Sequence, residues 1–374
     1  MPGGGREVRL VPKRSSTFHD WPYSGPARKC FHAWIVNLTP PGRDHCIHDC
    51  VYCYARHAVY SRAPEGVMQI YSNLPELVER DLRGIRLCPP LSISNTTDPC
   101  QAVPEVRRET RRLVELLVRR GPSFSITTKA DPSFLLDVEG FARFPRKSVA
   151  ITIEGPPEVL RLLSPGAPPY GRRLEALRRM SSSGVASIVR LDPVILHLWR
   201  ALYGEGWRER LREVMEDFRT AGAIHVVSST GRLSKSAPAP TMLQRLKEVV
   251  GSVSPRLAEE MERDYVFSRG GGGEGYLLRW PLRIEFHRVA RAEAEGLGMS
   301  YATCQETPAS LTDSEHLPHC EGFCLPFTLK GPDGIFRPVP GCTANCHVHC
   351  AGRAPPCGRR ELASPRPLRI ASLR

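Results

Sequence analysis

The chain has 374 residues, enough for two domains of roughly 150 residues each or for one large barrel with an extension. Its 35 prolines and 31 glycines together stay below the roughly 25–30% that is typical of disordered chains, which excludes a disordered protein. Basic residues outnumber acidic ones by 13 and most are arginine, an excess that thermophily, GC-rich coding or a nucleic-acid partner would each explain.

The N-terminal stretch from Met1 to Lys13 contains no apolar run, so we expect neither a signal peptide nor contact with a membrane. These features favour a cytoplasmic protein. Disulfides are rarely stable in that compartment, and 13 cysteines are an odd number. We therefore interpret the cysteine clusters as metal ligands or reactive groups.

Residues 1–29 are predicted to form a basic N-terminal arm. The basic side chains considered for contact with phosphate groups are Arg6, Arg9, Lys13 and Arg14. An arm that is merely solvated is the alternative.

The first predicted strand, Ala33–Leu38, is followed by Cys46, Cys50 and Cys53 in a C-x3-C-x2-C spacing. Three thiolates so close together fit one face of a cubane iron–sulfur cluster, whose irons prefer sulfur ligands. The fourth iron then has no protein ligand from this motif. The alternative is a zinc site that His45, His48 or His57 would complete, although zinc sites usually pair their cysteines in C-x2-4-C spacings.

With Tyr52 directly before the last cysteine, this motif resembles that of the radical SAM superfamily. The resemblance implies a [4Fe-4S] cluster on Cys46, Cys50 and Cys53 and S-adenosylmethionine (SAM) bound to the open iron. It also implies reductive cleavage of SAM to methionine and a 5′-deoxyadenosyl radical, with an electron donor such as flavodoxin or ferredoxin.

Six strands alternate with amphipathic helices in the next 200 residues. The predicted strands are Ala33–Leu38, Leu91–Asn95, Phe124–Thr128, Ser148–Ile153, Val185–Leu191 and Ile224–Ser228. Two clear helical patterns between them are Pro104–Arg120 and Trp207–Ala221. This alternation predicts parallel pairing and an α/β fold, a partial (β/α)6 TIM-type barrel over residues 30–230. Sites on such a fold lie at the carboxyl ends of the strands, which is where the cysteine loop begins.

Beyond residue 230 the alternation stops. We expect no strand from Gly231 to Lys235, helices near Met242–Val250, Arg256–Arg263 and Leu282–Gly296, and a flexible loop or linker at Gly270–Gly275. Residues 231–298 are thus predicted as a helical extension with a Gly-rich linker, and residues 299–374 as a Cys-rich, loop-rich, metal-binding region.

Four short sequence motifs in the core resemble those of the spore photoproduct lyase and DNA-repair-photolyase-like branch of the superfamily. They lie at Cys50–Arg56, Ser94–Pro99, Ile126–Lys129 and Arg190–Pro193. The resemblance implies that Tyr52 contacts the adenine of SAM and Lys129 its carboxylate, with Thr152, Asn95 and Arg190 as neighbours. From the residues alone, Lys129 also fits a solvated loop, Thr152 a strand filler, and Arg190 a buried ion pair with Asp192 or Glu154.

One departure from that branch concerns the hydrogen-donating cysteine that spore photoproduct lyase carries after its second strand. Asn95 stands at the nearest position here, and Cys100 lies five residues further on. Both a catalytic and an ordinary role stay open for Cys100, and repair of thymine dimers is in doubt.

The tail carries a second group of thiols that resembles no standard zinc ribbon or auxiliary-cluster domain. The candidate ligands are Cys320, Cys324, Cys342, Cys346, Cys350 and Cys357. We expect an auxiliary iron–sulfur cluster there, or structural zinc aided by His316, His319, His347 or His349, because ligation supplies folding free energy that a tail with few apolar residues lacks. Thiols without a metal are the remaining alternative.

The sequence therefore predicts a radical SAM iron–sulfur enzyme that abstracts hydrogen from its substrate, with DNA or RNA as a candidate substrate. The rival is a non-catalytic zinc or iron–sulfur protein that binds nucleic acid. Arginines on helix faces are expected to be solvated, namely Arg108, Arg111, Arg112, Arg119, Arg172, Arg173, Arg178 and Arg179. The sequence predicts no oligomeric state.

Overall fold

The computed structural model describes residues 6–20, 34–57, 64–234, 240–269, 274–364 and 369–374. Cys30 and most of the Gly-rich stretch at 270–275 lie outside the described residues. Within these ranges no helix is both long and apolar enough to cross a membrane.

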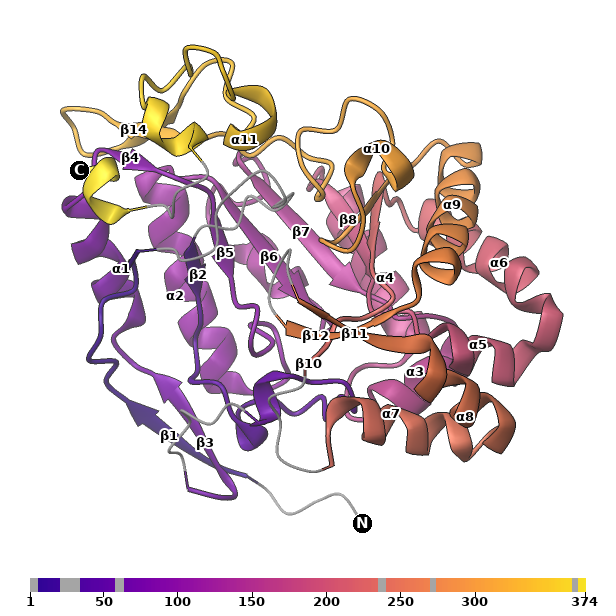
Figure 1. Ribbon diagram of the computed structural model, residues 1–374. Coiled ribbons are helices and arrows are strands. Elements are labelled where there is room, and N and C mark those ends of the chain that lie inside the picture. The colour runs from indigo at the N-terminus through magenta and orange to yellow at the C-terminus, as the bar shows by residue number, and fades with distance from the viewer. Residues whose placement is uncertain (1–5, 21–33, 58–63, 235–239, 270–273, 365–368) are drawn as a thin grey trace.

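Seven parallel strands form the main sheet, in the spatial order β13-β9-β8-β7-β6-β5-β2 (Figure 1). They are β2 (Trp34–Val36), β5 (Leu91–Ile93), β6 (Phe124–Thr128), β7 (Lys147–Thr152), β8 (Ser187–Leu191), β9 (His225–Ser228) and β13 (Ser300–Thr303). The six predicted strands and the partial barrel are confirmed. The seventh strand, β13, was missed because it is four residues long and lies in the segment predicted as the Cys-rich tail.

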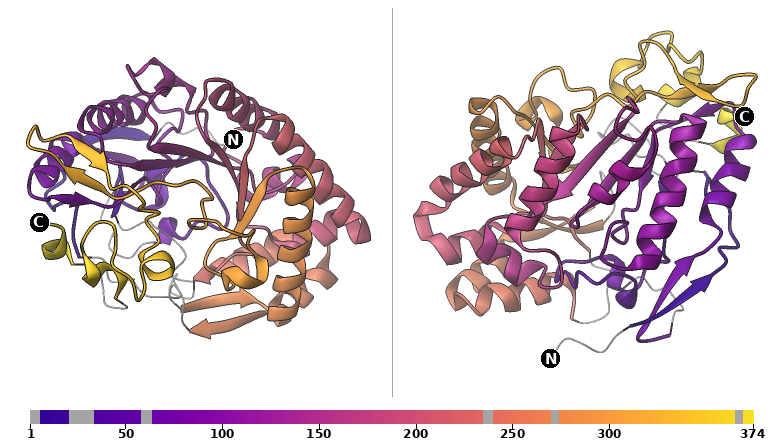
Figure 2. Two further views of the ribbon diagram at one scale, coloured as in Figure 1. Left: turned by 90° about the horizontal axis from the view of Figure 1, so that it is seen from above. Right: turned by 180° about the vertical axis from the view of Figure 1, so that it is seen from behind.

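Helices cover the outer face of this curved sheet, as the views in Figures 1 and 2 show. They are α1 (Leu74–Arg83), α2 (Pro104–Arg120), α3 (Pro157–Leu163), α4 (Tyr170–Ser182), α5 (Leu196–Tyr203), α6 (Trp207–Thr220) and α9 (Trp280–Gly296). Helix α2 has the predicted bounds: proline stands in its first turn, and Gly121 ends it at φ 88°, with its N–H bonded to the Leu117 carbonyl.

The core follows the two-residue alternation of the strands. Val149 and Ile151 of β7 belong to the large apolar cluster that packs against the helices. Ala150, between them, belongs to a smaller cluster with Ile188 and Val227, which faces the barrel interior. The interior is therefore lined with apolar side chains below the carboxyl ends of the strands.

The N-terminal arm contains a strand, β1 (Glu7–Val11), which pairs in parallel with β3 (Val67–Tyr71). Arg9 in this strand forms an ion pair with Glu7. The guanidinium of Arg6 donates a 2.9 Å hydrogen bond to the carbonyl of Cys46, so the arm contacts the cysteine loop.

The extension contains the expected helices and a small antiparallel sheet that was not expected. Helices α7 (Met242–Gly251) and α8 (Pro255–Asp264) are present. The sheet has the order β10-β12-β11, with β10 (Leu233–Ser234), β11 (Tyr265–Arg269) and β12 (Glu274–Leu278). The expectation of no strand at Gly231–Lys235 was wrong. β10 is only two residues long, and its partner β12 lies far along the chain, with Leu233 paired to Tyr276 and Ser234 to Gly275.

The tail passes the barrel interior at Cys320 and then pairs with β4 at the edge of the barrel. It contains α10 (Ala309–Thr312), β14 (Thr328–Lys330), β15 (Phe336–Pro338) and α11 (Cys346–His349). β14 pairs with β4 (Leu87–Cys88), which precedes β5, and Ser123 before β6 donates to the carbonyl of Pro326. This part of the tail therefore packs at the amino ends of the strands.

Candidate active site

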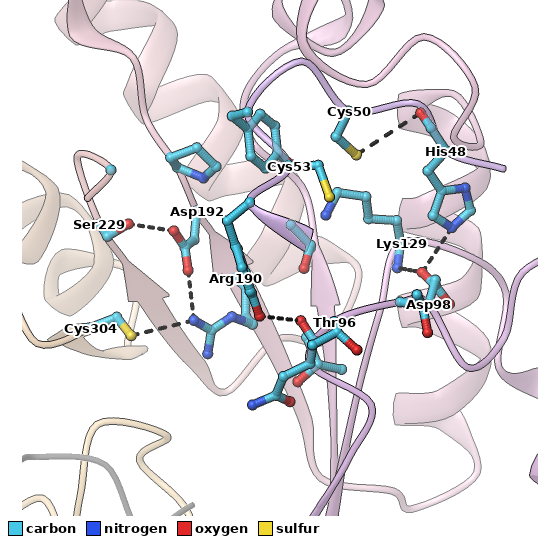
Figure 3. Close-up of a pocket in the computed structure, with 18 of the residues that line it drawn as sticks. His48, Cys50, Cys53, Thr96, Asp98, Lys129, Arg190, Asp192, Ser229 and Cys304 are labelled. Atoms are coloured by element: carbon cyan, nitrogen blue, oxygen red, sulfur yellow. Dashed lines mark hydrogen bonds and ion pairs between the residues drawn. The ribbon is translucent and has the colours of Figure 1, made fainter. Parts of the chain in front are cut away.

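The cysteine loop and the carboxyl ends of the main strands border one cavity of about 400 Å³ (Figure 3). Cys46, Cys50 and Cys53 all line it. This is the edge at which ligands bind in parallel α/β folds. The volume lies within the roughly 300–1,000 Å³ that is usual for small-molecule and cofactor sites.

Close backbone contacts hold the cluster loop, which we define as residues 46–53. The N–H of Gly166 donates to the carbonyl of His48 at 3.0 Å, and the Gln101 side chain accepts from the Ile47 N–H at 3.0 Å. A β-carbon on Gly166 would lie under 3.0 Å from the Ile47 carbonyl oxygen. The loop can therefore approach this segment only because residue 166 is glycine.

A buried hydrogen bond also ties the loop to the strands. The Nε2 atom of His48 lies 2.9 Å from Oδ2 of Asp98. Asp98 also accepts hydrogen bonds from Thr128 Oγ1 at 2.7 Å and from the N–H groups of Lys129 and Cys100 at 2.5 and 2.8 Å. Burial raises the pKa of Asp98, but His48 and these donors outweigh it and keep the carboxyl ionised. One nitrogen considered as a zinc ligand thus faces Asp98.

Tyr52 and Lys129 share a buried carboxylate beneath the loop. The Tyr52 hydroxyl donates to Oε1 of Glu154, and Lys129 Nζ lies 3.7 Å from the same oxygen. Arg173 donates to the other carboxylate oxygen at 2.5 Å, and the Glu154 and Arg173 side chains are fully buried. Lys129 and Arg173 thus flank one carboxylate, and the Lys129 ammonium lies beside the thiols, where it lowers the pKa of Cys50.

The other predicted SAM neighbours also border the cavity. Asn95 follows β5 and accepts a 2.7 Å hydrogen bond from Ser92, and Thr152 is the last, buried residue of β7. Arg190 projects from β8. The structure therefore brings all five residues beside the triad, while their roles toward SAM stay predictions.

Arg190 joins three acceptors on the cavity wall across from the cluster loop (Figure 3). It donates to Asp192 at 2.6 Å, to Glu321 at 2.7 Å and to the sulfur of Cys304 at 3.6 Å. The predicted partner Asp192 is present, whereas Glu154 pairs with Arg173 instead. Asp192 also accepts a hydrogen bond from Ser229.

Sequence reasoning missed four residues of this site: Glu154, Arg173, Cys304 and Glu321. Arg173 was expected on a solvated helix face, but it is 1% exposed, because α4 turns this position toward β7. A carboxylate just after a strand end was the available signal for Glu154. The sequence holds no comparable signal for Cys304 and Glu321, because their positions depend on the tail returning to the barrel.

Cys100 does not border the cavity. It is fully buried, and burial raises the pKa of its thiol. Among the described residues that line the cavity, Cys304 is the one thiol besides the triad.

The six tail thiols predicted as ligands do not gather in one place, and none of them lines the cavity. Cys320 is buried among the interior residues Ala150, Ile188 and Val227, and Cys324 is exposed. The other four are Cys342, Cys346, Cys350 and Cys357. The described cysteines form no disulfide with one another.

The triad has the donor set that a cluster with one open iron requires: three thiols at the rim of a cavity, beside a positive charge. Burial raises the pKa of Cys46 to about 11 and that of Cys50 to about 12, so both are neutral without a cation and would release protons to a metal. No group of three or more ligands in the described part of the chain already surrounds a metal position. The thiols would therefore converge as the cluster binds.

No protein-family model matches the chain. A curated relative from Pseudomonas phage M6, a radical SAM Nalpha-GlyT isomerase, is 26% identical over 361 residues, which cover 92% of this chain and 72% of the relative. An uncharacterized protein of Methanocaldococcus jannaschii is 26% identical over 158 residues, 40% of this chain and 57% of that protein.

Solved structures of spore photoproduct lyase share the fold. A mutant of that enzyme superposes with a TM-score of 0.58 at 18% identity, over 79% of this chain and 82% of the lyase. Another mutant, with bound AdoMet and dinucleoside spore photoproduct, gives 0.57 at 17% identity over 80% and 82%. Together with the cysteine motif at the cavity, these comparisons support a radical SAM enzyme, and the fold is that of spore photoproduct lyase.

Proposed function

We propose that this enzyme holds a [4Fe-4S] cluster on Cys46, Cys50 and Cys53, binds SAM in the cavity, and abstracts hydrogen from a nucleotide base or a modification on it. One observation carries the proposal: the three thiols and the five predicted SAM-binding residues border the same cavity. When bound, the cluster and SAM supply an electron and a 5′-deoxyadenosyl radical.

The side chains around the cluster loop would bind and orient SAM. Lys129 carries a charge, since burial lowers its pKa but nearby acidic groups, Glu154 among them, raise it more, and it suits the SAM carboxylate. Tyr52 is held in place by its hydrogen bond to Glu154. Thr152 offers a hydroxyl at the end of β7.

The opposite wall would position the substrate. Arg190 is held by two carboxylates, so its guanidinium lies in one orientation and can direct its remaining N–H groups to a base. Cys304 beside it places a thiol at the same wall. This pre-formed geometry holds the reacting carbon in a defined position.

A nucleotide base fits this cavity better than a stretch of the nucleic-acid phosphate backbone. Lys129, Arg190 and Arg232 are balanced by three carboxylates among the described lining residues, so the lining does not favour a polyanion. A volume of about 400 Å³ cannot admit a duplex, so the target base must leave the stack. The phosphates would stay at the rim, where the chain's excess of arginine can neutralise them.

The comparisons support this substrate class. One lyase structure contains a dinucleoside photoproduct, and the phage relative that matches 92% of this chain is named for GlyT isomerisation. We therefore propose a base-modifying rearrangement or cleavage in DNA, with reduced flavodoxin or ferredoxin as the electron source.

The first test is anaerobic reconstitution with iron and sulfide, followed by reduction in the presence of SAM. Wild-type protein should release 5′-deoxyadenosine, and the Cys50→Ala variant should release none. Equal, negligible yields from both proteins would support the rival, a non-catalytic metal protein.

The second test addresses the substrate. The probes are phage-type DNA with modified bases, unmodified single strands and unmodified duplexes. The enzyme should bind them with an affinity that falls steeply as the salt concentration rises. Release of 5′-deoxyadenosine should rise with the modified DNA. Weak binding that is indifferent to salt, with no rise in release, would exclude nucleic acid.

A further inference from the structure

Four tail thiols form a group separate from the cavity: Cys342, Cys346, Cys350 and Cys357. A β-carbon on Gly341, which precedes Cys342, would lie 3.7 Å from the ring of Pro356, which precedes Cys357. The segment that carries Cys342 and Cys346 therefore lies against the segment that carries Cys357.

The local backbone arranges these thiols in a way that suits ligation. Cys346 begins the short helix α11, and the N–H of Cys350 bonds to the Cys346 carbonyl at 3.2 Å, so the two cysteines lie one helical turn apart. Cys357 returns through a turn in which the Gly358 N–H bonds to the Pro355 carbonyl at 2.9 Å. These segments adjoin one another, and no three ligands among the described residues already surround a metal position, so ligation would draw the thiols together.

The sulfur of Cys342 already accepts two backbone hydrogen bonds. The N–H groups of Phe327 and Ala344 both donate to it at 3.3 Å. Ala344 adopts φ 64°, a left-handed conformation that a residue with a β-carbon rarely takes. This strained turn directs its N–H at the sulfur, and donors aimed at a sulfur stabilise the thiolate that binds metal.

Four free thiols in one partly buried group need an explanation. Packing alone does not require them, because Cys342, Cys346 and Cys357 only touch the edge of the apolar core. As thiolates they would repel one another unless a cation lay between them. Four thiolates are a common ligand set of structural zinc and of iron–sulfur clusters.

We propose that Cys342, Cys346, Cys350 and Cys357 form a second metal centre, a four-thiolate site for zinc or an iron–sulfur cluster, whose role is structural. Cys320 is excluded from the ligand set, because it is enclosed in the barrel interior. Cys324 is exposed, and its thiol donates to the Cys342 carbonyl at 3.4 Å, so it lies beside the group without being counted among the four ligands.

The position of the centre supports a structural role. None of its four cysteines lines the cavity, and Phe327, which donates to Cys342, directly precedes β14 at the amino ends of the strands. In Figure 1 the tail around α11 and β14 lies at that end of the molecule. Glu321, which accepts a hydrogen bond from Arg190, lies before these four cysteines in the chain. Ligation would fix the loops that follow it.

The test counts metals in full-length protein purified anaerobically. In a Cys46→Ala/Cys50→Ala/Cys53→Ala variant, which cannot hold the SAM-cleaving cluster, we expect about one zinc or about four irons per chain. Zinc and iron counts distinguish the two metals. A Cys346→Ser/Cys350→Ser variant should lose that metal and keep the iron of the triad, whereas Cys324→Ser should keep both.

Absence of metal from the triad variant, or full metal in Cys346→Ser/Cys350→Ser, would overturn the proposal. If the latter variant does not fold, a mercurial is titrated into the folded triad variant instead. Metal release in step with the blocking of four thiols supports the site, and reaction of all thiols without release overturns it. These readouts do not depend on SAM cleavage, so they are distinct from a failure of the proposed function.

Discussion

The guanidinium of Arg173 donates a 2.5 Å hydrogen bond to the carboxylate of Glu154, and water reaches neither side chain. The same carboxylate accepts from Tyr52 in the cluster loop and lies 3.7 Å from Lys129. Packing of α4 against β7 thus places a buried charge network directly beneath the residues that would hold the cluster and SAM.

Arg173→Met should lower the free energy of unfolding by about 3–5 kcal/mol, because it leaves the buried Glu154 without its main partner. Urea denaturation of the metal-free protein measures this. Arg178→Met on the same helix is the control, since Arg178 and its partner Glu175 are 51% and 40% exposed and such a pair contributes at most about 1 kcal/mol. Equal losses in both variants would contradict a special role for the buried pair.

Gly166→Ala should displace the cluster loop, since its β-carbon would collide with the Ile47 carbonyl. We expect a folded protein that retains markedly less iron in the triad after reconstitution. Gly171→Ala is the matched control, because a β-carbon there meets nothing within 4 Å. Normal iron content in Gly166→Ala would show that the loop adjusts.

Cys304→Ala should lower turnover of the substrate about tenfold or more, the effect of losing one interaction with a charged group worth roughly 1.5–3 kcal/mol. Cys304 lines the cavity and its sulfur lies 3.6 Å from the Arg190 guanidinium. Cleavage of SAM without substrate should persist. The comparison is Cys100→Ala, which alters a buried thiol outside the cavity and should keep turnover. Equal turnover in the two variants would place Cys304 outside the reaction.

His225 should make the protein less stable in weak acid. Burial lowers its pKa more than the Cys320 carbonyl and the charges of Glu321 and Asp313 raise it. The ring is therefore neutral, with Nε2–H donating to the Cys320 carbonyl at 2.9 Å and Nδ1 accepting from Ser300 at 2.8 Å.

The unfolded chain binds a proton near pH 6.5 and the folded chain only at lower pH, so the contribution of His225 to stability is present above pH 6.5 and decreases below it. The slope approaches about 1.4 kcal/mol per pH unit for one proton. Denaturation of wild type and His225→Gln between pH 5 and 8 measures the difference. Parallel curves would mean that His225 titrates alike in both states.

The sequence alone determined the features that depend on local spacing. The positions of Cys46, Cys50 and Cys53 within eight residues define a cluster motif whatever the rest of the chain does. The strands and α2 followed from periodicity, because a buried strand or an amphipathic helix carries its apolar pattern within a few residues. The carboxyl-edge location of Tyr52, Lys129, Thr152 and Arg190 followed from parallel topology.

Only the tertiary structure decided which distant groups meet. Glu321 reaches Arg190 across 131 residues, and Cys304 borders the cavity directly after a seventh strand that pairs with β9. It also separated four tail thiols from Cys320, which spacing could not do. The physical reason is the same in each case: burial and charge pairing are properties of segments brought together by folding, and no local pattern in either segment records its partner.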